Sequence, residues 1–266
     1  MLILAAVAVL ALLMGLPLLI VFVEALNHGL PFAWAAITDP DAVSAIQLTV
    51  MVAAISVAVN TVGGLAAAWC IARFQFQGRG LLLTLIELPF SLSPIISGLV
   101  WVLLFGAQGW FGSALQNAGV QIIFALPGLV LATLLVTFPF VARTLIPLMQ
   151  DQGYDEEAAA LTLGAGGFTT FFRITLPNIR WALLYGVLLC NARAMGEFGA
   201  VSVVSGHIRG LTTTLPLHVE VLYNDYDFVG AFAAASLLAS LGLITLVLKT
   251  GLEWRHAGEL AANRRH

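Results

Sequence analysis

Charged side chains are scarce in this chain, in which Asp, Glu, Lys and Arg make up 9% of the 266 residues. Soluble globular domains contain about 25% charged residues, so this composition excludes an ordinary soluble domain. Hydrophobic residues instead make up 60% of the sequence, and its mean hydropathy is +0.99. These values predict that most of the chain lies in a lipid bilayer.

Several chemical motifs are also absent. The two cysteines, Cys70 and Cys190, both lie in apolar stretches without metal-ligand spacing, so we expect neither a disulfide framework nor a metal site. The glycine-rich phosphate loop of ATPases does not occur, and neither does a nucleophile elbow or a basic nucleic-acid patch. We therefore expect a chain that is not an enzyme, has no cofactor of its own and binds no nucleic acid.

Six apolar stretches are long enough to cross a bilayer, which takes about 20 residues for about 30 Å of hydrocarbon. The absence of short alternating strands predicts an all-α membrane protein. The first stretch has no basic segment before it and exceeds the apolar core of a signal peptide, about 7–15 residues, so we expect it to be retained. The six predicted spans are residues 2–26, 42–71, 81–105, 127–149, 181–204 and 228–248.

We expect one polytopic domain over residues 1–250, followed by a cytoplasmic tail at 251–266. Positive residues gather between the second and third stretches, between the fourth and fifth, and at or after the end of the sixth. Because cytoplasmic loops carry an excess of Lys and Arg, both termini are predicted to be cytoplasmic. The residues that set this orientation are Arg73, Arg79, Arg173, Arg180, Lys249, Arg255, Arg264 and Arg265.

A more polar, glycine-containing hairpin at about residues 151–180 separates the fourth and fifth stretches. Asp155, Glu156 and Glu157 open it, where negative charge favours the start of a helix. A run of alanines follows, and Gly164 can end that helix in a left-handed conformation. The residues alone leave two interpretations, an ordinary interfacial connector or a small-residue face on which another protein docks.

The spacing in this hairpin resembles the EAA loop of ABC-importer permeases, which is E-A-A, three residues, Gly, nine residues and I-x-L-P. The glycine and the I-x-L-P part match in full. The acidic position falls on Ala158, and Glu157 stands one residue earlier. The ATPase-docking residues that the resemblance implies are Glu157, Ala158, Ala159, Ala160, Gly164, Ile174, Leu176 and Pro177.

The likeness covers most of the chain. Residues 88–100, 137–143, 191–210 and 214–223 resemble permease subunits of sulfate and thiosulfate importers, particularly the second of the two paired subunits. This resemblance implies the type I ABC-importer permease fold and a place in the bacterial inner membrane. It also implies three partners: a cytoplasmic ATPase dimer that uses ATP and Mg²⁺, a second related permease, and a periplasmic sulfate-binding protein.

Arg193 and Glu197 lie four residues apart in the fifth stretch, on one face of the expected helix. Charged side chains inside a bilayer are costly, so they are usually paired or functional. Either they pair and hold the bundle together, or Arg193 offers positive charge to a passing dianion. The third stretch contains two prolines, which either bend a helix or mark where it lines a water-filled path. Serine hydroxyls beside them suit an oxyanion. The candidate anion path comprises Arg193, Glu197, Ser91, Ser93 and Ser97.

Three further residues have weaker functional grounds. Arg143, near the inner end of the fourth stretch, is expected to reach the interface or to pair with Asp151. His207 and Arg209 lie in the longest outer loop. They are either ordinary loop residues or candidate outer-face contacts for the binding protein or the entering anion.

Other functions are open on the sequence alone. The same importer type would suit molybdate, tungstate or another tetrahedral oxyanion. An ion-coupled secondary carrier is a different class, for which the interrupted third stretch and the Arg193–Glu197 pair are compatible features. We find no internal repeat of the kind that such carriers contain. A membrane scaffold, the third class, would tolerate replacement of Gly164 and Arg193.

Overall fold

The computed structural model describes residues 1–262, which are largely helical and contain no strand. Four helical segments are long and apolar enough to cross a bilayer: Ile3–Leu26, Pro40–Arg73, Leu126–Asp151 and Phe228–Gly251. Two bent pairs of helices pass the same test, so the number of spans reaches six when each pair counts as one. The all-α membrane fold predicted from composition is confirmed.

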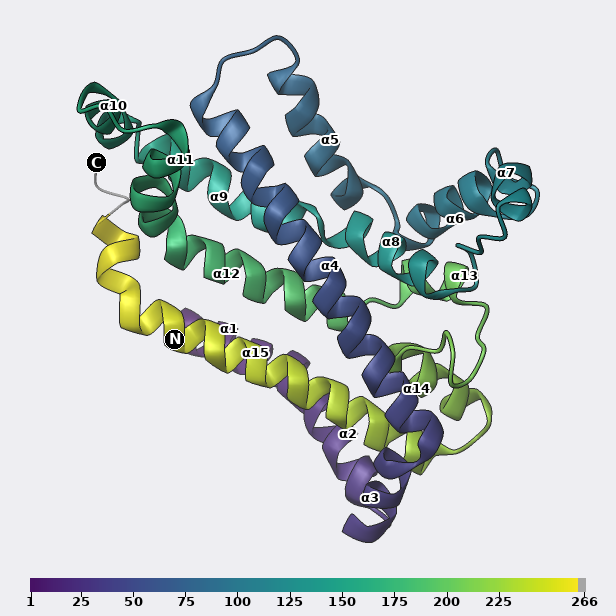
Figure 1. Cartoon of the computed structure of the whole chain (residues 1–266). Coiled ribbons are helices and arrows are strands. Elements are labelled where there is room, and N and C mark those ends of the chain that lie inside the picture. The colour runs from purple at the N-terminus through teal and green to yellow at the C-terminus, as the bar shows by residue number, and fades with distance from the viewer. Residues whose placement is uncertain (263–266) are drawn as a thin grey trace.

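The first span lies along the outside of the bundle. It consists of α1 (Leu2–Leu10), a π-helical turn η1 (Ala11–Gly15) and α2 (Leu16–Leu26), and α2 packs against α15 (Phe228–Ala262) (Figure 1). Its most apolar window is not buried within the chain, so this surface faces lipid or another subunit. A short helix, α3 (Leu30–Thr38), then packs on α15 and leads into the central helix.

The central helix α4 (Pro40–Arg73) crosses the bundle diagonally (Figure 1). It packs against the span formed by α8 (Leu126–Thr137) and α9 (Pro139–Asp151), and against α12 (Leu176–Met195). Pro139 separates α8 from α9, because proline provides no N–H to continue the helical hydrogen bonds. These helices hold the elements that carry the candidate site.

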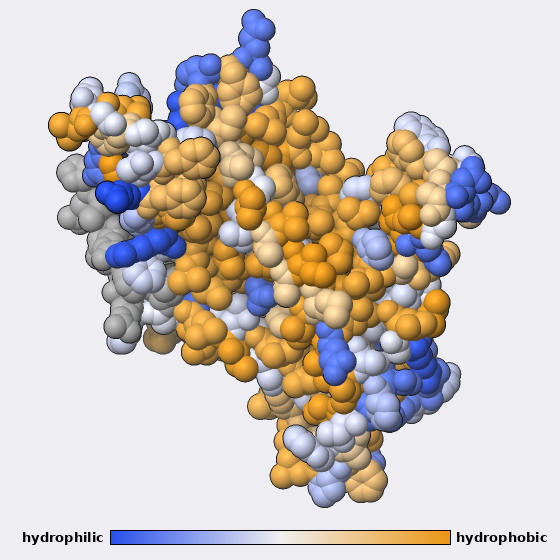
Figure 2. All heavy atoms as spheres, viewed as in Figure 1, coloured by the Kyte–Doolittle hydropathy of each residue, from blue (hydrophilic) through white to orange (hydrophobic). Residues whose placement is uncertain are grey.

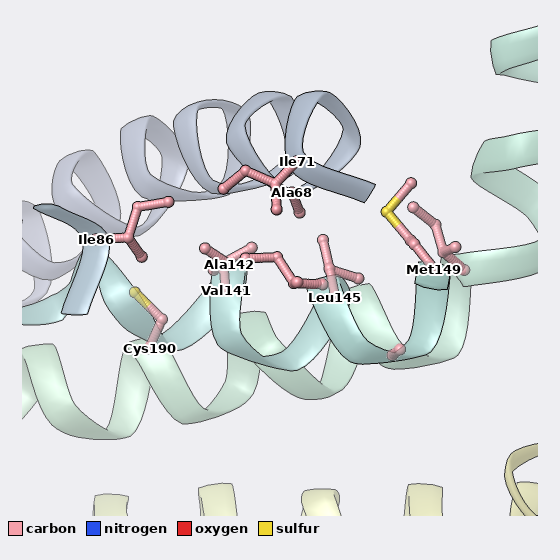
Figure 3. Close-up of a cluster of buried hydrophobic side chains, with 11 residues drawn as sticks. Ala68, Ile71, Ile86, Val141, Ala142, Leu145, Met149 and Cys190 are labelled. Atoms are coloured by element: carbon pink, nitrogen blue, oxygen red, sulfur yellow. The ribbon is translucent and has the colours of Figure 1, made fainter. Parts of the chain in front are cut away.

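The main core forms where α4, α9 and α12 meet (Figure 3). Gly64 of α4 permits the close approach, because a Cβ there would lie 2.8 Å from the Cβ of Val141. Small residues play this role between membrane helices, where backbones approach closely. The buried residues of this core are Ala68, Ile71, Ile86, Val141, Ala142, Leu145, Ile146, Met149, Ile179, Ala182 and Cys190.

Two of the predicted spans are broken helices. Helices α5 (Arg79–Ser91) and α6 (Pro94–Phe105) are bent by 110° relative to each other. Residues 181–204, expected as one continuous span, are bent by 50° between α12 and α13 (Gly199–Ser205). Irregular backbone inside a bilayer is stable only within protein or beside a water-filled cavity, so both breaks are candidates for the transport path.

The remaining short helices gather at two ends of the bundle (Figure 1). Helices α10 (Asp155–Thr162) and α11 (Gly167–Thr170) and the π-helical turn η2 (Phe171–Thr175) lie at the end that also holds the N-terminus and the last turns of α15. Helices α7 (Gly112–Asn117) and α14 (Leu215–Asn224) lie at the other end.

Helix α15 continues through Ala262, so no break marks the predicted start of the tail at residue 251. Arg264 and Arg265, which contribute to the predicted orientation, lie outside the described residues.

Apolar residues cover much of the visible surface (Figure 2). Large exposed side chains include Leu13 of η1, Leu81 of α5 and Leu103 of α6. A soluble monomer rarely exposes so large an apolar area, so these surfaces fit lipid or neighbouring transmembrane helices.

Candidate functional site

The hairpin between α9 and α12 turns at Gly164, whose φ of +86° lies in the left-handed region that glycine adopts without strain. The N–H of Ala165 donates to the carbonyl of Ala160, and the N–H of Gly164 donates to the carbonyl of Leu161, both at 3.0 Å. These two bonds form a Schellman motif that ends α10. A Cβ at position 164 would meet nothing within 4 Å, so the backbone angle alone favours glycine there.

Large apolar side chains project from this hairpin into the surroundings. Leu163 is 88% exposed and Phe168 is 85% exposed, on either side of the Gly164 turn. Such a patch marks a surface that contacts another protein or the membrane. We call it the hairpin tip, and its residues are Tyr154, Leu161, Leu163, Phe168 and Phe172.

The alanine run lies beside the hairpin tip and is only partly available to a partner. Ala159 is exposed, Ala158 is half-buried, and Ala160 is buried. Most of the exposed apolar area therefore comes from larger residues that the small-residue hypothesis did not single out. At the end of the hairpin, Ile174 and Leu176 are half-buried and Pro177 is exposed at the start of α12.

Glu157 points into the protein and anchors the hairpin. Its Oε2 lies 2.9 Å from Nε of Arg73 at the end of α4, and the two side chains are 14% and 9% exposed. Its Oε1 accepts a hydrogen bond from Oγ1 of Thr175 at 2.6 Å. The Arg73 guanidinium also donates to the carbonyl of Met149 in α9. Arg73, Glu157 and Thr175, which we call the hairpin anchor, thus connect α4, α9, α10 and η2.

Arg193 and Glu197 are brought together at the break between α12 and α13. Nη1 of Arg193 lies 2.6 Å from Oε2 of Glu197, whose side chain is 1% exposed, against 33% for Arg193. Oε1 of Glu197 accepts the N–H of Ala200 at 2.9 Å, which satisfies an otherwise free donor in the first turn of α13. The ion pair therefore fixes the bend, and part of the guanidinium stays accessible.

The three serines of the third stretch occupy different environments. Ser97 is fully buried in α6, and its Oγ donates to the carbonyl of Ser93. Ser91 is exposed at the end of α5, and its Oγ donates to the carbonyl of Leu88 at 2.8 Å. Ser93 is exposed at the break itself. Ser91 and Ser93 are therefore the two exposed serines of the candidate anion path.

The outer-loop residues lie near one end of the bundle. His207 is exposed with a φ of +55°, and Arg209 forms an exposed ion pair with Asp225. His218, in contrast, is buried in α14 with 4% of its surface exposed. Burial lowers the pKa of His218 below its ordinary value of 6.5, and the nearby Asp41 and Asp39 partly oppose that shift.

Acidification is expected to destabilise this end of the molecule through His218. A histidine whose pKa is lowered on folding binds a proton more readily when unfolded, so stability falls as the pH drops below about 6.5. The melting temperature of the purified protein should therefore decrease between pH 7 and pH 5.5, and His218→Gln should reduce that decrease. His207→Gln is the control, because His207 is exposed. An equal pH dependence in wild type and His218→Gln would contradict this expectation.

No three His, Cys, Asp or Glu side chains gather with the geometry of a metal site in the part of the chain that was described. Cys70 and Cys190 are free thiols.

The chain resembles known transport proteins over most of its length. Residues 60–255 match the family described as binding-protein-dependent transport system inner membrane component. The chain is 54% identical over 239 residues to the sulfate transport system permease protein CysW of Escherichia coli, covering 90% of this chain and 82% of that protein. It is 55% identical over 240 residues to the CysW protein of Synechocystis sp., covering 90% and 87% respectively.

A more distant relative is the sulfate transport system permease protein CysT of Salmonella typhimurium, which is 35% identical over 213 residues and matches 80% of this chain and 77% of that protein. The fold is similar to a chain in the crystal structure of a bacterial alginate ABC transporter in complex with an alginate pentasaccharide-bound periplasmic protein. The TM-score is 0.77 at 15% identity, covering 96% of this chain and 93% of that chain. The predicted permease fold is thereby confirmed, and the chain belongs to the family of inner membrane components of binding-protein-dependent transport systems.

Proposed function

We propose that this chain is one permease subunit of an ATP-driven importer that carries sulfate and thiosulfate across the bacterial inner membrane. The names of its relatives support the cargo, since CysW of Escherichia coli and of Synechocystis sp. are sulfate transport system permease proteins. The chain lacks a phosphate-binding loop, so ATP and Mg²⁺ are used by a separate ATPase dimer. A second, related permease and a periplasmic sulfate-binding protein complete the importer.

The observation that carries this proposal is the exposed hairpin tip held by a buried anchor. An apolar patch containing Leu163 and Phe168 would be costly in water unless a partner covers it. The anchor of Arg73, Glu157 and Thr175 ties that patch to the ends of two spans. Movement of a docked ATPase would therefore be transmitted to α4 and α9.

The proposed orientation, with both termini in the cytoplasm, is supported by charges at the same end of the bundle. Arg173 lies in the hairpin and Arg73 pairs with Glu157 of the hairpin, which agrees with the excess of positive charge in cytoplasmic loops. The N-terminus and the last turns of α15 lie at that end too, which supports two cytoplasmic termini (Figure 1).

The anion route is proposed to pass the two helix breaks. Ser91 and Ser93 would contact the anion at the α5–α6 break, and Arg193, held by Glu197, would attract it at the α12–α13 break. His207 and Arg209 are proposed as outer-face contacts for the binding protein, since both are exposed.

Replacing Gly164 tests the docking role. In Gly164→Val, a β-branched residue must adopt a φ of +86°, which costs about 1–2 kcal/mol. That cost lowers the equilibrium constant for forming the native turn by about tenfold. We expect the ATPase to co-purify less well and uptake of labelled sulfate to fall by about tenfold in proteoliposomes. Gly164→Asn is the matched control, because asparagine tolerates the left-handed region.

Undiminished uptake and undiminished ATPase recovery by Gly164→Val would show that the hairpin does not dock the ATPase. The cargo is tested separately by asking which oxyanion, with its binding protein, stimulates ATP hydrolysis in the assembled complex. Stimulation by molybdate and not by sulfate would overturn the cargo and leave the docking role intact. Transport by the isolated chain without any ATPase would instead indicate a secondary carrier.

A further inference from the structure

A groove with a volume of about 440 Å³ lies between the end of α5 and the middle of α9. It is roomy enough for a small hydrated anion and open to its surroundings. Apolar, hydroxyl and charged side chains line it together, which is unusual in a stretch that otherwise qualifies as a membrane span. The lining residues are Thr84, Glu87, Leu88, Phe90, Ser91 and Arg143.

Arg143 supplies the positive charge of this groove. Its Cζ lies 4.9 Å from the centroid of the Phe90 ring, and Phe90 in turn packs edge-on against Phe140 at 5.3 Å. A guanidinium over an aromatic face is held in place and keeps its outward N–H groups free. Among the residues whose side chains are described, Arg143 forms no ion pair with Asp151 or with another carboxylate, so of the two sequence-based alternatives the pair with Asp151 is absent.

Arg143 lies well inside a predicted membrane span, where a charge without an ion-pair partner needs polar surroundings. It lies eight residues before Asp151, the end of the α8–α9 span, which is about 12 Å along the helix. An ionisable side chain at such a depth faces a water-filled cavity or the inside of the bundle, because exposure to lipid is expensive. The groove also borders the α5–α6 break, where irregular backbone requires the same kind of surroundings.

We propose that this groove is an anion-binding site on the transport path, in which Arg143 binds a tetrahedral oxyanion such as sulfate. The inference rests on the proposed function and names a site for it. The guanidinium offers several N–H donors in a planar fork that matches two oxygens of such an anion. Ser91 and Thr84 hydroxyls, which now donate to the carbonyls of Leu88 and Gly80, would turn to the anion when it binds.

Glu87 keeps this site weak. It lies on α5 one helical turn before Ser91, faces the same groove, and forms no ion pair in the described part of the chain. Its carboxylate lowers the positive potential that the anion experiences. A transport site must release its ligand as well as bind it, so we expect Glu87→Gln to hold sulfate more tightly.

A thiol placed at Ser91 reports on the charge in the groove. The variant Ser91→Cys, made with Cys70→Ala in the complete transporter, is treated with anionic and cationic methanethiosulfonate reagents. The thiolate displaces methanesulfinate and forms a mixed disulfide, so the labelling rate measures the local concentration of each reagent. A cleft lined by charge of one sign concentrates the opposite ion by about tenfold or more, so labelling is also measured with Glu87→Gln, which removes the negative charge from the lining. In that background we expect the anionic reagent to react about tenfold faster relative to the cationic one than with a free thiol, and without that substitution the same preference should be smaller.

Arg143→Gln should abolish that preference, and sulfate should slow labelling where chloride at equal ionic strength does not. Glu87→Gln should lower the sulfate concentration that gives half-protection. The matched control is Arg180→Gln, because Arg180 also lies over an aromatic ring, that of Trp181, but outside the groove. These results, together with a large loss of sulfate uptake in Arg143→Gln but not in Arg180→Gln, would support an anion-binding site in the groove.

Equal labelling preferences with and without Arg143, or no protection by either sulfate or molybdate, would overturn the proposal. Loss of the second permease from the Arg143→Gln complex would also overturn it, since Arg143 would then be a contact between subunits. Protection by molybdate and not by sulfate would support the groove and contradict the proposed cargo, so the two failures are distinguishable.

Discussion

Arg73→Gln is expected to stop sulfate uptake while ATP hydrolysis continues. Removal of the guanidinium leaves the largely buried carboxylate of Glu157 without its ionic partner, a change that costs about 3 kcal/mol for a largely buried pair. That cost lowers the equilibrium constant between the anchored and the detached hairpin by about a hundredfold. On the proposed docking, helix α10 would remain bound to the ATPase but lose its connection to α4 and α9. Uptake and ATP hydrolysis are measured on the same proteoliposomes.

Two variants make this result specific. Arg73→Gln combined with Glu157→Gln removes both charges, and because amides can still hydrogen-bond, we expect it to recover much of the uptake. Arg79→Gln is the matched control in the same loop, since Arg79 donates to Gln75 and lies outside the hairpin anchor. Wild-type uptake by Arg73→Gln would exclude a coupling role for the anchor. Loss of the whole complex would reveal an assembly defect instead.

The hairpin shows what could be predicted from the sequence. Its position, its helical start at Asp155 and its turn at Gly164 follow from local residue preferences, and all three are present. The direction of Glu157 could not be predicted, because its partner Arg73 is distant in the sequence and counted only as a positive loop residue. Glu157, which stands one residue before the acidic position of the EAA pattern, binds inside the protein.

The breaks in the spans could also be predicted from the sequence only in part. Two prolines predicted an interruption of the third stretch, but Pro89 lies inside α5, and the helix ends only before Pro94. Proline restricts the residue before it to extended angles, as observed at Ser93. The 110° angle depends on the packing of α6 against α13, where Gly98 lies close to Ala200. No local pattern encodes that contact, and Gly196 alone did not predict the second break.

Glu197→Ala is expected to cause the largest loss of stability among these variants. The change leaves Arg193 without its partner and removes the acceptor for the Ala200 N–H. Breaking a buried pair costs about 3–5 kcal/mol, and loss of a helix-capping acceptor adds about 1 kcal/mol. We expect a clear decrease in the melting temperature of the purified complex. Glu87→Ala, which removes an exposed carboxylate, should change it little. A melting temperature equal to that of the wild type would show that the pair is not structural.

The double variant Arg193→Met with Glu197→Gln separates stability from transport. It contains no unpaired charge, and the glutamine oxygen can still accept the Ala200 N–H, so we expect stability within about 1 kcal/mol of the wild type. If Arg193 attracts the anion, sulfate uptake by this stable complex should still be slow. Uptake at the wild-type rate would assign the pair to the bend alone and leave Arg143 as the cation of the path. Glu197 both fixes the bend and neutralises Arg193. Only a variant that keeps the bend intact can therefore show whether the charge of Arg193 affects transport.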